Sequence, residues 1–474
     1  YIDLGIEMLS RRKWRDQYEL ALDLFSTGSE LGYCTGLHDK VDAFTAEVVA
    51  NARSTEETIR VNSTQVLSLS GRGDVGAGMS LCLDTLKKLG EPYPRTCGIC
   101  RILWELYLTK RALRGKTEED ILRLPRIEDP RIISSMQMIY VLFPLVAVSN
   151  IGSAPLPAFR LVRLTLKHGL SPLAGIAFDI YAGSLVRLGE YDEAHRWAHL
   201  ANVILNRYRS RQLHAKVKFV FWATVQTIHV PHRDILKPVW DSFRIGMKTG
   251  DIEISLAACT FHEVFRIYLG DPLPEILKSL LKSEGLCLVY NQMKLVGLTG
   301  CAQQLCHNLQ GFAKEPLVLT GQYCDEEKDM RRLRAQNLTT AVSVIVHFKF
   351  MLAAVLNENE YAESVFKANP DCFGFQLMPF LTIHHYLHRG VVSAALARSS
   401  AGRVRRRRRY IADAQRNIEK LKTLLIHCPD NIIPKIQLIE AELEFCKGRF
   451  STALIHYRKS ISYAQRARFI TEQA

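Results

Sequence analysis

Apolar residues recur at three- and four-residue spacing along most of the chain. Ahead of Gly189, such a stripe is formed by Phe178, Tyr181, Ala182 and Leu185. This spacing places the apolar side chains on one face of an α-helix. Alternation of period two, which marks a half-buried strand, is sparse. The pattern therefore predicts an all-α protein.

One stretch indicates how these helices pair. Gly189 ends a helix, and Tyr191 packs back against that helix. Small residues then follow at Ala194, Ala198 and Ala201. Small side chains one turn apart let two helices approach closely. This arrangement is typical of a tetratricopeptide-like hairpin.

The same arrangement recurs elsewhere, which predicts an α-solenoid of partly degenerate hairpins. Near the C-terminus it comprises Gly448, Phe450, Ala453 and Tyr457. Weaker copies centre on Gly36 and on Gly71, with Gly76 at a small-residue position, and the first two glycines are 35 residues apart. That separation is close to the period of about 34 residues of such repeats.

We predict one array over residues 1–474. It comprises N-terminal repeats at 1–124, degenerate helical pairs at 125–396, an arginine-rich insertion at 397–409 and a C-terminal repeat at 410–474. A hydrophobic fraction of 47% over 474 residues is that of a globular protein and excludes a disordered chain.

Composition also bears on location. The longest apolar stretch, residues 139–148, is interrupted by Pro144, so we expect no membrane span. Twelve cysteines without a secretion signal favour reduced thiols and a cytoplasmic protein. Because the chain begins at Tyr1, we interpret it as a piece of a longer polypeptide.

The arginine run of the insertion supplies six of the positive charges behind the net charge of +14: Arg403, Arg405, Arg406, Arg407, Arg408 and Arg409. Three interpretations stay open: a solvated loop, a docking or nuclear-targeting patch, and a nucleic-acid contact. The loop is favoured, because Tyr410 is the only adjacent aromatic residue that could stack on bases.

A glycine triplet formally matches a dinucleotide-binding fingerprint, Gly71-x-Gly73-x-x-Gly76. Residues 65–70 before it could form the strand that this motif needs, and Glu91 lies where a ribose-binding acid is expected. Helical pairs flank the triplet, however, so we interpret its glycines as packing positions and expect no cofactor.

Cysteine and histidine groups are candidates for a metal or redox site. They are Cys97 with Cys100, Cys301 with Cys306 and His307, His262 with Glu263, and the cluster His384, His385 and His388. None has the complete spacing of a known metal motif. We therefore expect buried thiols and packing or surface histidines, and no metal.

Sequences of the phosphate-binding GxxxxGK[ST] type, the G-x-S-x-G type and the kinase signatures do not occur. We therefore expect no enzyme activity from this chain. Two alternatives remain. One is a free-standing enzyme or a cofactor or metal binder that uses residues 71–78 or the Cys/His groups. The other is a charge-driven nucleic-acid-binding solenoid.

Several ordered stretches resemble one family. They are residues 14–20, 86–92, 124–130, 168–172, 246–251, 270–273, 427–431 and 438–443, followed by Gly448, Phe450, Ala453, Tyr457 and Ala464. In this order they resemble the helical region of large multidomain signalling ATPases. The resemblance extends from about Trp14 to Glu472, and the arginine-rich insertion departs from it.

The resemblance implies a parent protein with a serine/threonine-kinase-like domain and an AAA-type ATPase domain before this region. It implies GAF and histidine-kinase modules after it, as in two-component signal transduction. The expected role of this chain is regulatory and non-catalytic: it would bind protein partners or flanking domains of the same polypeptide and couple their states. No membrane or nucleic-acid partner is expected.

Overall fold

The structure is a computed structural model, and it describes residues 1–94, 97–150, 152–208, 210–373, 378–400 and 402–473. These residues form helices and loops, with two isolated bridges, Arg126–Leu170 and Thr320–Asp325, and no strand. The all-α, solenoid-like fold predicted from the apolar spacing is confirmed.

The N-terminal half of the array is built from short helices followed by helical hairpins. Its elements are α1 (Ile2–Glu7), α2 (Lys13–Asp16), α3 (Tyr18–Cys34), α4 (His38–Asn51), η1 (Glu56–Thr58), α5 (Ile59–Arg72), α6 (Val75–Lys88), α7 (Ile99–Leu113), α8 (Glu118–Leu122), α9 (Pro130–Ser149), α10 (Pro155–His168), α11 (Pro172–Arg187) and α12 (Tyr191–Tyr208).

The C-terminal half continues the pattern, with one π-helical segment, η2. Its elements are α13 (Arg211–Val220), η2 (Phe221–Gln226), α14 (Thr227–His229), η3 (His232–Ile235), α15 (Leu236–Thr249), α16 (Ile252–Leu269), α17 (Leu273–Val289), α18 (Met293–Leu309), α19 (Glu326–Ala335), α20 (Thr339–Val355), α21 (Asn359–Ala368), η4 (Pro370–Phe373), α22 (Pro379–Ser399), α23 (Val404–Lys422), α24 (Pro429–Cys446) and α25 (Phe450–Ala467).

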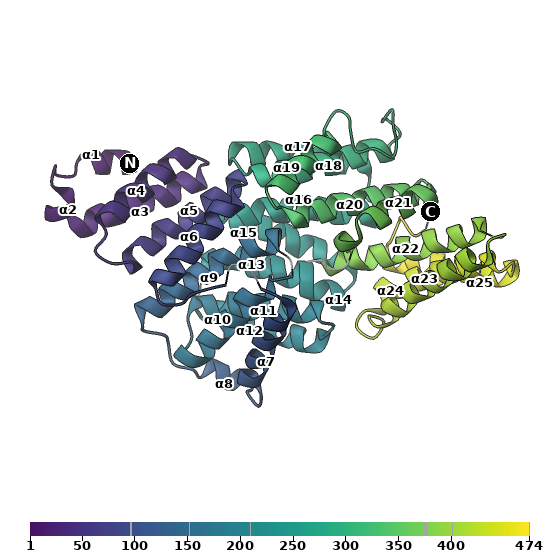
Figure 1. Ribbon diagram of the computed structural model, residues 1–474, viewed down its shortest axis with the longest axis horizontal. Helices are drawn as coiled ribbons and strands as arrows, with labels where there is room; N and C mark the ends of the chain where they lie inside the picture. The colour runs from purple at the N-terminus through teal and green to yellow at the C-terminus, as the bar shows by residue number, and fades with distance from the viewer. Residues whose placement is uncertain (95–96, 151, 209, 374–377, 401, 474) are drawn as a thin grey trace.

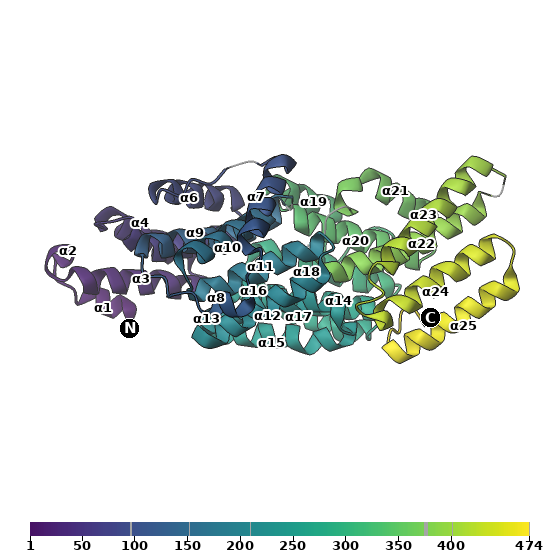
Figure 2. The same cartoon turned by 90° about the horizontal axis from the view of Figure 1, so that it is seen from below.

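Consecutive helices pack as antiparallel pairs, and the pairs stack into an elongated array. The most extensive contacts join α24 with α25, α11 with α12, α22 with α23, α15 with α16, and α3 with α4. In Figure 1, α1–α4 lie at one end of the array and α24 and α25 at the other. Figure 2 shows the same order from below.

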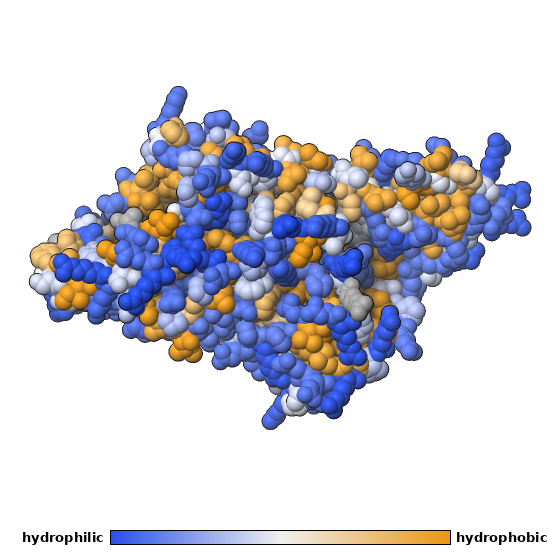
Figure 3. Space-filling view, turned by 180° about the vertical axis from the view of Figure 1, so that it is seen from behind, coloured by the Kyte–Doolittle hydropathy of each residue, from blue (hydrophilic) through white to orange (hydrophobic). Residues whose placement is uncertain are grey.

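Most of the buried apolar residues belong to one hydrophobic cluster that extends from Ile59 to Phe469. A separate small cluster between α3, α4 and α5 includes Phe25 and Val48. Stacked hairpins share their apolar faces with the next pair, which produces a continuous core. The surface seen from behind is largely hydrophilic with scattered apolar patches (Figure 3).

Helix α9 is longer and more apolar than residues 139–148 suggested. It begins at Pro130, capped by Asp129, and its 20 residues are by length and composition sufficient to cross a membrane. In this structure, 56% of its apolar window is buried within the protein. The core helix of a soluble protein passes the same test, so α9 is weak evidence for a span.

Candidate functional site

Three of the predicted repeat glycines lie at the turns between paired helices. Gly36, Gly189 and Gly448 have φ of 75°, 81° and 80°, and they follow α3, α11 and α24. A positive φ is favourable for glycine and strained for other residues. These glycines therefore let each first helix end and the chain reverse into the second.

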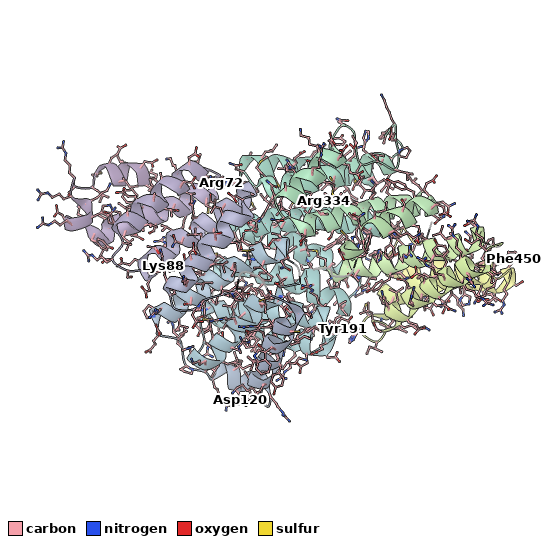
Figure 4. The ribbon with its side chains drawn as sticks, in the orientation of Figure 1. Arg72, Lys88, Asp120, Tyr191, Arg334 and Phe450 are labelled. Atoms are coloured by element: carbon pink, nitrogen blue, oxygen red, sulfur yellow. The ribbon has the colours of Figure 1, made fainter. Side chains whose placement is uncertain are left out.

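The small residues predicted for close packing are buried, whereas the aromatic residues differ from one another. Ala194, Ala198, Ala201 and Ala453 are all 1% exposed or less. Tyr191 is half-buried against the His427 ring, and the Tyr457 hydroxyl donates a hydrogen bond to Glu442. Phe450 is 62% exposed, with its ring edge on Phe445. Tyr191 and Phe450 lie far apart (Figure 4), so these residues define the repeats and not one site.

The fingerprint glycines do not form a nucleotide-binding turn. Residues 65–70 belong to α5, so the strand that this motif requires is absent there. Gly71 lies within α5, and a Cβ on it would come within 2.7 Å of the Gln292 amide. Gly73 ends α5 at a φ of 89°. The packing role predicted for Gly76 is wrong, because Gly76 is exposed and a Cβ there would meet only Asp74, at 3.9 Å.

The arginine run does not form the loop that composition favoured. Arg403 is the N-cap of α23, and residues 405–409 form its first turns; Ala401, within the predicted insertion, is outside the described residues. The helix forms because Tyr410 and Ala414 pack into the core. Two of the arginines also bind neighbouring helices: Arg406 pairs with Glu360 at 2.5 Å, and Arg407 donates a hydrogen bond to the Cys446 carbonyl oxygen at 2.8 Å.

The histidine cluster of α22 is buried in aromatic packing. His384 lies against Phe380 with ring centroids 4.6 Å apart, and His385 is stacked on Phe373 at 4.5 Å. Burial and neighbouring cations hold the pKa of both side chains well below the usual histidine value. These rings are therefore neutral near pH 7 and act as core residues.

One group of side chains in the described residues has the proximity of a metal site: Cys301, Cys324 and Asp329. Cys301 lies on α18, and Cys324 precedes α19. Their sulfur atoms are 2.7 Å apart, and the Cys324 sulfur is 3.4 Å from Asp329 Oδ2. A tetrahedral zinc ion would hold two thiolates about 3.7 Å apart and would need a fourth ligand. The arrangement fits zinc poorly and a disulfide better.

We expect oxidised glutathione to convert Cys301 and Cys324 into a disulfide. The two thiols lose two protons and two electrons, and glutathione disulfide is reduced to two thiols. Contact with Cys301 and burial raise the pKa of Cys324, so the reaction should be slow at pH 7 and faster as the pH rises. Closing this loop should stabilise the fold by about 3 kcal/mol. Peptide mass spectrometry without reductant measures the bond.

The matched controls are Cys301→Ser, which should abolish the disulfide, and Cys306→Ser on the same helix, which should leave it intact. A disulfide that forms equally well in Cys301→Ser would contradict the assignment. No local pattern in the sequence predicts this pair, because Cys324 is 23 residues from Cys301 and does not share a motif with it.

Helix α7 buries two polar side chains together with apolar ones, and it leaves four large apolar side chains exposed. Its buried positions include Glu105 and Thr109, and Arg163 of α10 binds both; Arg163 Nη1 lies 2.8 Å from Thr109 Oγ1. The outward side carries four large residues that we call the α7 face: Ile99, Leu103, Trp104 and Tyr107, which are 63%, 54%, 55% and 53% exposed.

The two aromatic rings of the α7 face are stacked at an angle to each other. The Trp104 and Tyr107 centroids are 5.5 Å apart, with 27° between the ring planes. Large exposed aromatic and aliphatic side chains gathered on one helix are typical of protein interfaces. Sequence reasoning missed this face because apolar residues surround the whole helix, so periodicity could not distinguish the inner side from the outer side. The available signal was the Trp–Tyr pair itself.

Exposed positive charges lie at the C-terminal end of α7, and the acidic first turn of α8, residues 118–120, follows them. Arg111 and Arg114 are exposed at the end of α7, and Lys116 follows them. The one carboxylate of α7, Glu105, is neutralised by Arg163 and by Arg101, which lies at 2.8 Å. The C-terminal end of α7 is therefore complementary to a partner with an apolar stripe that has acidic residues beside it.

The paired packing of the helices defines an all-α, solenoid-like fold. No family model matches this chain, and none of the curated proteins compared with it matches either.

Proposed function

We propose that this chain is a non-catalytic, regulatory protein-interaction segment. Because its sequence resembles the helical region of large signalling ATPases, we propose that it belongs to a multidomain signalling ATPase or kinase. There it couples flanking modules by binding one of them. The α7 face carries the proposal, because four large apolar side chains, two of them aromatic, stay exposed on one helix while its other side packs on α10.

The partner that fits is an amphipathic acidic helix of a flanking module. The spacing of Ile99, Leu103 and Tyr107 presents one row of apolar side chains, as a groove-binding helix requires. The exposed Arg111 and Arg114 would attract acidic residues beside the partner's apolar stripe. Binding at this face would favour one orientation of the neighbouring module over others, which is the physical basis of coupling.

The Trp104→Ser substitution should weaken binding of the flanking module by about thirtyfold, because truncation of a central aromatic residue at an interface commonly costs about 2 kcal/mol. The melting temperature should change little, since the ring is half exposed in the free chain. The measurement is the affinity of separately produced ATPase and kinase modules for this chain.

A matched control is Phe312→Ser, because Phe312 is 67% exposed and lies in the loop after α18. That change should leave binding intact. A photo-crosslinking amino acid placed at Tyr107 of the whole parent polypeptide should join α7 to the same module. Equal affinity for Trp104→Ser and the unmodified chain would exclude the α7 face.

A further inference from the structure

An apolar cavity of about 230 Å³ lies in the middle of the array. Helices α9, α11, α13, α16, α18 and α20 all contribute to its wall, and Figure 1 shows α11, α13 and α16 near the middle of the molecule. Apolar wall residues include Phe143, Ile180, Phe219, Ala257, Leu298 and Val344. A concave, mostly apolar wall with a few polar groups is typical of small-molecule sites.

Charged side chains lie in this apolar wall. Lys216, Glu253 and Lys294 all line the cavity, and each is less than 10% exposed. Lys294 is paired with Glu253 Oε1 and also donates to the Ser70 hydroxyl at 2.9 Å. Glu253 is thereby partly satisfied, whereas its Oε2 atom is buried without a hydrogen-bond partner among the described residues.

Lys216 differs from Lys294 because no carboxylate is paired with it in the described part of the chain. Its ammonium donates one hydrogen bond, to the neutral Tyr140 hydroxyl at 3.0 Å, and lies 4.5 Å from the centre of that ring. Burial acts to lower the pKa of Lys216, but Tyr140 and the more distant Asp251 and Glu253 outweigh it and raise the pKa. A charged ammonium therefore faces the cavity with hydrogen-bonding capacity to spare.

The backbone around the cavity is irregular on two sides. Pro144 interrupts the hydrogen bonding of α9, and Thr224 lies in the π-helical segment η2. Both residues line the cavity. Single π-helical turns occur frequently at functional sites, where they re-aim side chains at the cost of regular hydrogen bonding.

We infer that this cavity binds a small amphipathic carboxylate, with its hydrocarbon part against the apolar wall and its carboxylate on Lys216. The ligand would bring the acceptor oxygens that the Lys216 ammonium lacks. A neutral hydrocarbon would fill the cavity, but it would leave Tyr140 as the one hydrogen-bond partner of the Lys216 ammonium among the described residues. This site is independent of the α7 face, so each can fail without the other.

The first test compares octanoate with octan-1-ol on the unmodified chain by isothermal titration calorimetry. We expect octanoate to bind with one molecule per chain, and the alcohol at least about tenfold more weakly, because it cannot form a charge-assisted bond with Lys216. Equal affinity for the two compounds, or no binding of octanoate, would overturn the inference.

The second test locates the site with a matched pair at Gly183 of α11, which lines the cavity. A Cβ at this position would lie 3.7 Å from Thr224 Oγ1, an ordinary contact, so Gly183→Ala should retain octanoate binding. Gly183→Phe should fill the cavity and lower the affinity at least about tenfold. Retained binding in a folded Gly183→Phe variant would place octanoate elsewhere and overturn the inference.

Lys216→Met tests the head-group contact. In this variant the preference for octanoate over octan-1-ol should fall to near unity, and a preference that stays unchanged would contradict the role of Lys216. Circular dichroism confirms that each variant is folded. Should Lys216→Met fail to fold, the comparison of the two compounds on the unmodified chain and the Gly183 pair still decide the outcome.

Discussion

Replacing Lys435 with methionine should lower the free energy of unfolding by about 3–5 kcal/mol, the usual cost of leaving one member of a buried ion pair alone. Lys435 lies on α24 with no exposed surface, and its ammonium is 2.6 Å from Glu472 Oε1. The ammonium also lies 4.0 Å from the centre of the Phe469 ring. Removing the ammonium leaves the almost fully buried carboxylate of Glu472 without its ion-pair partner.

Among the residues that the structure describes, only His384 lies near enough to Glu472 to replace Lys435 as its cation. The nearest candidate is His384 Nδ1 at 3.9 Å, but burial and the Lys435 ammonium hold the pKa of His384 well below its usual value. The pair also anchors the C-terminal segment, whose Thr471 hydroxyl donates to the Tyr268 carbonyl oxygen at 2.6 Å. The loss should therefore be largest around α24, α25 and the end of α16.

Urea denaturation measures the total loss, and hydrogen exchange of residues 268–271 and 469–473 measures where it occurs. The matched control is the double variant Lys435→Met/Glu472→Gln, in which no charge is left buried. It should recover most of the stability, because a neutral pair avoids the cost of the unpaired carboxylate. If the double variant is as unstable as Lys435→Met, packing around the lysine stem is the cause and the ion pair is not.

The local features of the fold could be predicted because they depend on neighbours in the sequence. The turns at Gly189 and Gly448 need a residue with positive φ at the end of a helix, and the stripe before Gly189 needs only helical spacing. Lys435 shows the opposite case. It precedes the apolar stripe that begins with Ile436, yet its own burial depends on Glu472, which returns to it from the last turn of the chain.

Features assembled from distant segments could not be predicted. The cavity brings Phe143, Lys216 and Lys294 together from three helices, and no spacing rule relates such positions. The arginine run is a related case: its composition resembles a loop, but packing of Tyr410 against the core favours a helix there. Burial of side chains in the tertiary structure cannot be inferred from composition, and here it outweighs the local preference of the arginine run for a loop.

The Asp179→Asn substitution should stabilise the protein at pH 7 to 8. Asp179 lies on α11 with no exposed surface, and both of its carboxyl oxygens lack a hydrogen-bond partner in the described residues. Burial raises the pKa of this carboxyl well above its ordinary value, so the folded protein keeps a proton that the unfolded chain releases. Asparagine has nearly the same shape and has no proton to take up.

The gain in stability from Asp179→Asn should depend on pH, and its direction follows from the protons that Asp179 binds in each state. Between the unfolded and the folded pKa of Asp179, the folded state binds one more proton than the unfolded state. The free energy of unfolding therefore falls by about 1.4 kcal/mol for each pH unit of rise in that interval. The gain from Asp179→Asn should grow as the pH rises from 5 to 7 and shrink toward zero as the pH approaches 4.

Urea titrations of the unmodified protein and of Asp179→Asn at pH 4.5, 6 and 7.5 measure how the difference between their free energies of unfolding changes with pH. The control is Asp84→Asn on α6, where the aspartate side chain is exposed to solvent. Its stability curve should run parallel to that of the unmodified protein. Burial is what raises the pKa of Asp179. If the stability curve of Asp179→Asn also runs parallel to that of the unmodified protein, water or a shifted partner reaches this carboxyl. Helix α11 is then less tightly packed there than the burial of Asp179 indicates.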